Sequence, residues 1–210
     1  MIKIIIVDDH AIVREGLKQI VAEVSDIQVA GEAGSYADLI LLLQNIECNL
    51  IVMDINIPDK SGIEITKEIT MQSSHIPILI LSMYSEEQYG IRAIKAGASG
   101  YLQKISAPTE LITAIRKIYK GGKYISPLLA DKLAEYMNTS KNDLPHEVLS
   151  DREYTVMLKI ATGLSAEEIA NELNISTNTV YSYRNRIFEK IHLKSNVELT
   201  QYVLRNKLLI

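Results

Sequence analysis

The chain has 210 residues, of which 47% are hydrophobic and 23% are charged, an ordinary balance for a globular protein of one large or two modest domains. A single cysteine, Cys48, excludes an internal disulfide and a cysteine-ligated metal cluster, and it indicates a reducing, intracellular compartment. The apolar start is too short for a signal peptide, and no apolar run approaches the roughly 18 residues of a membrane span, so we expect a cytoplasmic protein without membrane contact.

The net charge of −4 is unevenly distributed along the chain. Residues 146–176 carry 2 basic and 6 acidic side chains, whereas residues 177–210 carry 6 basic and 2 acidic ones. A basic segment in an acidic protein indicates contact with a polyanion, although a solvated helix face would have a similar composition.

Apolar, β-branched runs alternate with segments of helical periodicity over the first 125 residues. The runs predict strands at residues 2–7, 27–30, 50–53, 76–81 and 100–102, and the segments predict helices at residues 12–24, 36–44, 61–72, 86–96 and 108–120. This alternation, with short turns, is typical of an α/β doubly wound sheet of parallel strands buried on both faces. We therefore expect a five-stranded parallel sheet with the carboxyl ends of its strands along one edge.

Polar side chains stand at that edge. Asp8 and Asp9 follow the first predicted strand, Asp54 follows the third, Ser82 follows the fourth, and Lys104 lies just beyond the fifth. Three neighbouring carboxylates repel one another unless a cation lies among them, and a set of oxygen ligands favours a hard ion such as Mg²⁺. Each residue alone could be a solvated loop residue, but together they indicate a site.

This ordered set of residues resembles the receiver domain of bacterial two-component response regulators, which have a flavodoxin-like fold. The resemblance implies that Asp54 is phosphorylated by a partner sensor histidine kinase. It also implies that Asp9 and Asp54 bind Mg²⁺ directly and Asp8 through water, with the main-chain carbonyl of Asn56 as a further ligand. Lys104 would pair with a phosphoryl oxygen.

The resemblance also implies a switch. The phosphoryl group would draw the Ser82 hydroxyl inward, and an aromatic side chain, here Tyr101, would rotate inward with it. From the sequence alone Tyr101 could equally be a core residue. Ser82 stands where threonine is commoner in the family, and Asn56 and Tyr84 would influence the lifetime of the phosphoryl group.

A connector follows the last helix of this part. Gly121 and Gly122 are suited to a helix C-terminus, residues 128–137 have a helical pattern, and residues 138–145 are polar and rich in turn formers, as in a flexible linker. We therefore expect a receiver domain at residues 1–122, a linker with a short helix at 123–147 and a second domain at 148–210.

The second domain has four helical segments, predicted at residues 152–162, 166–173, 177–191 and 197–206. Their starts carry helix-capping residues: Ser150 or Asp151, Ser165 with Glu168, Ser176, and Ser195 or Asn196. A short helix, a tight turn at Asn174 and Ile175, and a longer helix describe a helix-turn-helix in a small all-α domain.

This region resembles the LuxR-type DNA-binding domain in the segments 149–153, 161–163, 168–170, 175–176 and 179–180 and at Lys190. With the receiver it makes the NarL/LuxR type of response regulator. By this resemblance residues 177–190 form the recognition helix in the major groove of double-stranded DNA, and the last helix is a dimer contact. The candidate DNA contacts are Thr179, Tyr181, Ser182, Arg184, Asn185, Arg186 and Lys190.

The leading hypothesis is a transcription regulator, not an enzyme, whose dimerisation and DNA binding are gated by phosphorylation of Asp54. Its catalysis would be limited to its own phosphorylation from a donor and slow autodephosphorylation. One alternative is a phosphorylation-independent DNA-binding or protein-interaction regulator. Another is a phosphohydrolase with an Asp nucleophile, but such enzymes usually have a second Asp two positions on, where this chain has Asn56.

Overall fold

The computed structural model describes residues 1–58, 60–72, 76–138 and 144–209. The chain divides into two compact units, Met1–Tyr136 and Met137–Ile210, and each is described by itself below. Within the described residues, no helix is both long enough and apolar enough to span a bilayer.

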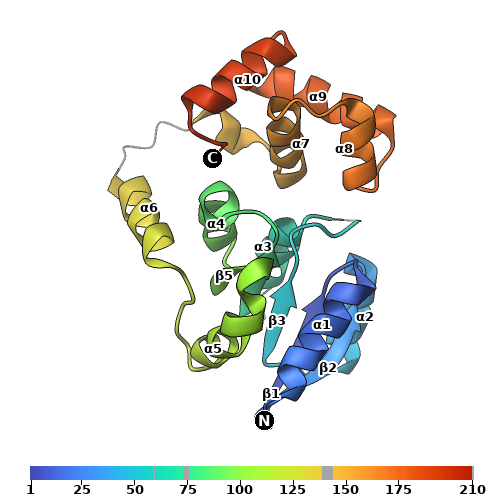
Figure 1. Cartoon of the computed structure of the whole chain (residues 1–210), viewed down its shortest axis with the longest axis vertical. Helices are drawn as coiled ribbons and strands as arrows, with labels where there is room; N and C mark the ends of the chain where they lie inside the picture. The colour runs from blue at the N-terminus through green and yellow to red at the C-terminus, as the bar shows by residue number, and fades with distance from the viewer. Residues whose placement is uncertain (59, 73–75, 139–143, 210) are drawn as a thin grey trace. The chain divides into compact units, whose positions relative to one another are not determined.

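The first unit is built on a five-stranded parallel sheet with the strand order β2-β1-β3-β4-β5 (Figure 1). The strands are β1 (Ile2–Val7), β2 (Ile27–Ala33), β3 (Leu50–Met53), β4 (Ile78–Ser82) and β5 (Gly100–Gln103). All residues of β3 and β4 are buried, as expected for central parallel strands covered on both faces. The predicted doubly wound sheet is therefore confirmed.

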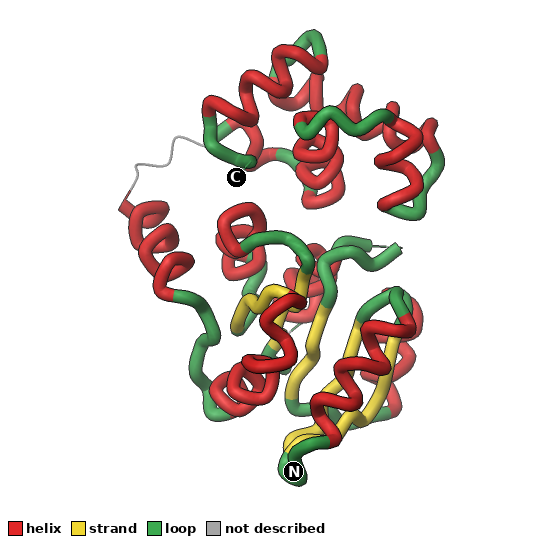
Figure 2. The backbone as a smooth tube through the Cα atoms, viewed as in Figure 1, coloured by secondary structure: helices red, strands yellow, loops and turns green. Residues whose placement is uncertain are grey.

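Helices connect the strands and cover both faces of the sheet (Figures 1 and 2). They are α1 (Ala11–Ala22), α2 (Tyr36–Asn45), α3 (Gly62–Met71), α4 (Glu86–Lys95) and α5 (Ala107–Tyr119), with a 3₁₀ turn, η1 (Lys104–Ser106), before α5. Helices α1 and α5 pack against each other, as do α3 and α4. Right-handed crossovers place α1 on one face and α2, α3 and α4 on the other, because the strand order reverses between β1 and β3. Helix α5 follows the last strand and packs beside α1.

Three strands differ in extent from the prediction, β5 only by ending one residue later, at Gln103. β2 was expected to end at residue 30 but continues to Ala33, because Ala30 is the extra residue of a bulge: Ile4 pairs with Val29 and Ile5 with Gly31. The bulge lets the ladder resume beyond the predicted end. β4 begins at Ile78 and not at residue 76; Pro77 has no N–H to donate to a ladder, and it contributes only its carbonyl, to the amide of Ile51.

Helix α6 (Pro127–Asn138), in the predicted connector, packs on the first unit. Its Leu129 side chain is buried and fits over Gly90 of α4, where an added Cβ would lie 2.7 Å from Leu129 Cδ1. Ser126, just before the helix, hydrogen bonds to Glu86 at the start of α4. The predicted flexible linker at 138–145 lies mostly outside the described residues, and Pro145 begins a 3₁₀ turn, η2 (Pro145–Val148).

The second unit is all helical. Its helices are α7 (Asp151–Ala161), α8 (Ala166–Glu172), α9 (Thr177–Ile191) and α10 (Asn196–Arg205). Ser150 and Ser165 each form a capping box, and Ser176 and Ser195 cap the other two helices, so the predicted helix starts are confirmed to within a residue. Asn174, in the turn between α8 and α9, has a left-handed backbone with φ 52°, which Asn tolerates better than most residues.

Candidate functional site

The carboxylates of the first unit meet where the strand order of the sheet reverses. Asp8 directly follows β1 and Asp54 directly follows β3, and these strands are neighbours on either side of the reversal. The amide of Asp54 donates to the carbonyl of Val7, which extends the ladder to the edge. In an open α/β sheet, this crevice at the carboxyl ends of the strands is where ligands bind.

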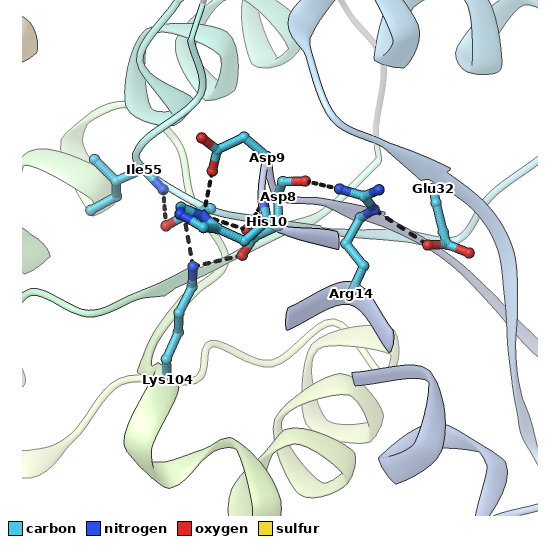
Figure 3. A network of polar contacts seen from close by, with 8 residues as sticks. Asp8, Asp9, His10, Arg14, Glu32, Ile55 and Lys104 are labelled. Carbon is cyan, nitrogen blue, oxygen red and sulfur yellow. Dashed lines mark hydrogen bonds and ion pairs between the residues drawn. The ribbon is translucent and has the colours of Figure 1, made fainter. Parts of the chain in front are cut away.

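Lys104 joins the two carboxylates. Its Nζ lies 2.6 Å from Asp8 Oδ2 and 2.9 Å from Asp54 Oδ2 (Figure 3). The three side chains come from segments far apart in sequence, yet Asp8, Asp54 and Lys104 expose only 2%, 4% and 11% of their side chains. The structure therefore brings the predicted acids and lysine together in one buried cluster.

Burial and charge act against each other in this cluster. Burial raises the pKa of Asp54 to about 6, the Lys104 ammonium opposes that rise, and the neighbouring Asp8 adds to it. Burial alone would lower the pKa of Lys104, but Asp54 and Asp8 raise it overall. A cation among the acids therefore favours an ionised Asp54 carboxylate, the form that a nucleophile needs.

Asp9 and His10 complete a set of possible metal ligands. Asp8, Asp9, His10 and Asp54 each offer a ligand atom within 4.8 Å of one another. His10 Nδ1 is 2.7 Å from Asp9 Oδ1. Among the described residues, Asp8 Oδ2 is reached only by the ammonium of Lys104 and Asp9 Oδ1 only by the ring of His10. Buried carboxylate oxygens with spare acceptor capacity fit a hard divalent cation.

The backbone around Asp54 is held by a close approach that the sequence analysis did not identify. Gly62 donates its N–H to the carbonyl of Ile55, and an added Cβ at Gly62 would lie 1.9 Å from the main-chain oxygen of Asp54. Asp54 Oδ1 in turn accepts the N–H of Ile55 at 2.7 Å. In the sequence, the only sign of this contact is a glycine four residues after Pro58. A glycine alone does not tell which backbone atom it approaches.

The predicted switch residues lie next to the carboxylates. Ser82 is buried, and its hydroxyl accepts the N–H of Tyr84 at 3.2 Å. Tyr101 is fully buried and donates its hydroxyl to the carbonyl of Tyr84 at 2.9 Å. Burial raises the pKa of Tyr101, and a hydrogen bond with Ser82 opposes the rise. Asn56 Nδ2 is 3.3 Å from the Tyr84 hydroxyl, so all four residues meet at the loop after β4.

The predicted DNA contacts lie along α9, but they are not equally available. Tyr181, Ser182, Asn185, Arg186 and Lys190 are exposed, whereas Thr179 and Arg184 are partly buried. The Thr179 hydroxyl lies 2.8 Å from that of the capping Ser176, and the Ser182 hydroxyl donates to the carbonyl of Asn178. Tyr181, Asn185 and Arg186 therefore present the most available polar groups among the candidates.

Two of the basic candidates have partners within the second unit. Lys190 Nζ lies 2.7 Å from the buried carboxylate of Glu153 on α7. The Arg184 guanidinium lies over the ring of Phe188, 5.2 Å from its centre, as in a cation–π contact. The Lys190 ion pair links α9 to α7, whereas the Arg184 contact is one turn apart within α9 itself.

An α/β sheet with a carboxylate and lysine cluster at its switch point, followed along the chain by a helix-turn-helix, is the architecture of a transcription regulator with a receiver domain. Residues 4–116 match the response regulator receiver domain, and residues 147–203 match the bacterial regulatory proteins of the luxR family. The chain belongs to the two-component response regulators of the NarL/LuxR type, and it is a DNA-binding member of them.

Full-length relatives agree with this assignment. The response regulator UvrY of Escherichia coli is 35% identical over 99% of this chain and 96% of its own length. The response regulator GacA of Pseudomonas aeruginosa is 34% identical over 98% of this chain and 97% of its own. Among solved structures, the complex of the response regulator RcsB with DNA has a TM-score of 0.60 and 25% identity, covering 96% of this chain and 97% of that one.

Proposed function

We propose that Asp54 accepts a phosphoryl group from the phosphohistidine of a cognate sensor histidine kinase, and that this modification gates dimerisation and DNA binding. The observation that carries the proposal is the buried cluster of Asp8, Asp54 and Lys104 at the switch point of the sheet. A carboxylate oxygen of Asp54 attacks the phosphorus, the bond from phosphorus to the histidine nitrogen breaks, and the imidazole leaves with its electron pair and takes up a proton.

The residues around Asp54 would hold a Mg²⁺ ion and orient the reaction. Asp9 and Asp54 would be the direct ligands, Asp8 would act through water, and the carbonyl of Asn56 would supply a further oxygen. When bound, Mg²⁺ neutralises charge on the oxygens of the phosphoryl group. Lys104, already 2.9 Å from Asp54, moves its pairing to a phosphoryl oxygen, and the Ser82 hydroxyl donates to another.

The response then passes through the loop after β4. Ser82 and Tyr101 both contact Tyr84 in that loop, and the Tyr84 ring stacks on Tyr89 of α4 with 4.7 Å between ring centres. We assign Tyr101 as the switch residue, because a shift of Ser82 toward the phosphoryl group changes the environment of the Tyr101 hydroxyl. The surface formed by α4 and α5 changes with it.

The output is binding of double-stranded DNA through α9. We assign base and phosphate contacts to the exposed face that carries Tyr181, Asn185 and Arg186, with Thr179, Ser182, Arg184 and Lys190 beside it. Helix α10 has two exposed apolar side chains, Val197 and Leu204, 66% and 59% exposed. They support dimer formation through α10, so we expect a two-fold DNA site.

We assign the receiver to residues 1–122, the connector to 123–147 and the DNA-binding domain to 148–210, in a cytoplasmic protein. We also propose that the protein is no enzyme toward added substrates and catalyses only its own phosphorylation and slow dephosphorylation. The Asn at position 56 supports this, because a phosphohydrolase of the Asp type needs an acid or base there.

The test compares wild type with Asp54→Asn, using acetyl phosphate and Mg²⁺ as the phosphodonor system and a pool of genomic DNA fragments as the ligand. DNA binding that rises with phosphodonor only in the wild type supports the gate. Equal binding in all samples, with no phosphate incorporated, contradicts it and favours a phosphorylation-independent regulator. Continuous release of phosphate from added phosphate esters would instead indicate a phosphohydrolase.

Arg186→Ala tests the DNA-binding surface separately. If Arg186 contacts a phosphate, its loss weakens binding to all fragments similarly and reduces the slope of log affinity against log salt by about 1. Lys207→Ala, a change of the same charge beyond α10, serves as the control. An unchanged salt slope in Arg186→Ala would remove that residue from the interface.

A further inference from the structure

We infer that Arg14 is a positioning residue for phosphorylation: it fixes the peptide that joins Asp8 to Asp9 and so sets the direction of both carboxylates. The inference rests on the proposed function of that pocket. Arg14 is not among the site residues predicted from the sequence, and it is not itself among the possible metal ligands.

The contact is between a side chain and the backbone. Arg14 Nη1 donates to the main-chain oxygen of Asp8 at 2.6 Å, as Figure 3 shows. That oxygen belongs to the planar peptide unit whose nitrogen is that of Asp9, so holding the carbonyl holds the whole unit. The N–H of Asp8 donates to Ala33 in the neighbouring strand. The backbone on both sides of the Asp8 Cα is therefore fixed, and its side chain is directed toward Lys104.

Arg14 is itself held from the other side. Its Nε lies 3.3 Å from Glu32 Oε2 at the end of β2, and Lys18 Nζ lies 2.9 Å from Glu32 Oε1 and 2.7 Å from Glu15 Oε2. Burial opposes ionisation of Glu32, but the bond from Lys18 outweighs it and lowers the pKa of Glu32. The Arg14 side chain is only 20% exposed, so it has few alternative positions.

The charges in this network cancel. Arg14 and Lys18 are cationic, and Glu15 and Glu32 are anionic, so the four groups add no net charge beside the pocket. The guanidinium also points at a carbonyl and not at either of the pocket carboxylates. Removal of Arg14 leaves the network one charge more negative, which by itself would favour a cation, so a weaker Mg²⁺ affinity in Arg14→Ala would come from the loosened turn and not from the lost charge.

Mobility of the turn at residues 8–10 would affect the position of the Asp9 carboxylate most. Asp9 lies between a fixed residue and His10, whose N–H donates to Asp8 Oδ1 at 2.9 Å. Without Arg14 the Asp8 carbonyl loses its donor, and the peptide can rotate, which moves the Asp9 carboxylate away from Asp54. Groups that orient metal ligands from behind typically change metal affinity by 10-fold to 100-fold, and we expect about a tenfold loss here.

The experiment uses the full chain as wild type, Arg14→Ala and Arg14→Lys, with Arg116→Ala as the control. Arg116 forms a two-point ion pair with Asp26 on the surface, at 2.6 and 2.8 Å, so its loss removes a similar contact elsewhere. The first readout is direct Mg²⁺ binding by calorimetry. The second is the Mg²⁺ dependence of phosphorylation by acetyl phosphate, and the third is amide hydrogen exchange of residues 8–10 without metal.

Arg14→Ala should raise the Mg²⁺ dissociation constant and half-saturation concentration about tenfold and speed exchange at residues 8–10, while the rate at saturating Mg²⁺ changes less. Arg14→Lys, with one donor group in place of the guanidinium fork, should recover part of the affinity. Arg116→Ala should bind Mg²⁺ as wild type does. If Arg14→Ala unfolds, Glu32→Gln, which keeps Arg14 but weakens its support, should show a smaller shift in the same direction.

Wild-type Mg²⁺ affinity in both Arg14→Ala and Glu32→Gln would overturn the inference, and so would an equal loss in Arg116→Ala. Failure of the proposed function looks different. If the wild type itself takes up no phosphate at any Mg²⁺ concentration, the proposed function fails and the inference fails with it.

Discussion

The ammonium of Lys104 lies between the carboxylates of Asp8 and Asp54, with its Nζ 2.9 Å from Asp54 Oδ2. The lysine thus stands where positive charge is needed before any phosphoryl group arrives. The Lys104 side chain is 11% exposed, so water has little access to the two carboxylates when the lysine is removed by mutation.

Lys104→Met should lower the free energy of unfolding by about 3 to 5 kcal/mol in the absence of Mg²⁺. Removing one partner of a mostly buried ion pair leaves the other charge uncompensated. Urea unfolding of wild type, Lys104→Met, Asp54→Asn and the double variant measures the coupling. The double variant should be more stable than the sum of the two single effects predicts; strict additivity would show that the pair contributes nothing.

Gly62→Ala should destabilise the first unit by about 1 to 3 kcal/mol and slow phosphorylation of Asp54. The added methyl group would lie 1.9 Å from the Asp54 carbonyl, and the backbone of the phosphorylated residue must move. Gly16→Ala in α1 is the matched control. An added Cβ there meets no atom within 4 Å, so it should stabilise the helix by about 0.5 to 1 kcal/mol.

Both glycine variants would be followed by urea unfolding and by phosphate incorporation from acetyl phosphate. Wild-type phosphorylation and stability in Gly62→Ala would mean that the close contact relaxes without moving Asp54.

Leu129→Ala should release α6 from the first unit. Leu129 is buried over Gly90, and truncation of a buried leucine usually lowers stability by about 2 to 5 kcal/mol. Amide hydrogen exchange across α6 should become faster, while the strands keep their protection. Leu128→Ala, at a neighbouring side chain that is 49% exposed, should change little. Equal effects of the two variants would show that α6 is not anchored through Leu129.

The stability of the second unit should fall in acid through Glu153. Burial opposes ionisation of this carboxyl, but Lys190 and the Ser150 N–H outweigh it and lower its pKa below the ordinary 4.5. The unfolded state therefore binds the proton first as the pH falls. The stabilisation is complete above about pH 4.5 and disappears as the pH drops through the lowered folded-state value.

Hydrogen exchange of α7, corrected for the intrinsic rate, measures this loss between pH 6 and pH 3. Glu153→Gln should flatten that dependence, whereas Glu189→Gln on the exposed side of α9 should leave it as in wild type. The same slope in all three proteins would exclude Glu153 as its source.

Much of the fold followed from patterns that act locally. The strands β1 and β3 have their predicted ends, because β3 is an unbroken apolar run, β1 is apolar except for Lys3, and both stop at an aspartate. The ends of β2 and β4 were wrong, since a bulge at Ala30 depends on the partner strand and the missing N–H of Pro77 matters only once a ladder exists.

The site shows the same division. Asp8, Asp54 and Lys104 could be placed together because parallel strands share an edge. Gly62 and Arg14 could not be placed, because each acts on the backbone of another residue. An added Cβ at Gly62 would lie 1.9 Å from the main-chain oxygen of Asp54. The Arg14 Nη1 lies 2.6 Å from the main-chain oxygen of Asp8. A residue type does not specify such an approach; the packed structure does.

The spacing of the pocket residues also fixes the order in which ribosomal synthesis supplies them. Asp8 and Asp54 come from neighbouring strands, whereas Lys104 lies 50 residues beyond Asp54. A nascent chain that has released β1 and β3 but not yet β5 holds the two acids side by side without their lysine. When β5 pairs with β4, Lys104, which directly follows β5, reaches the two acids. Formation of the last strand therefore completes both the sheet and the pocket.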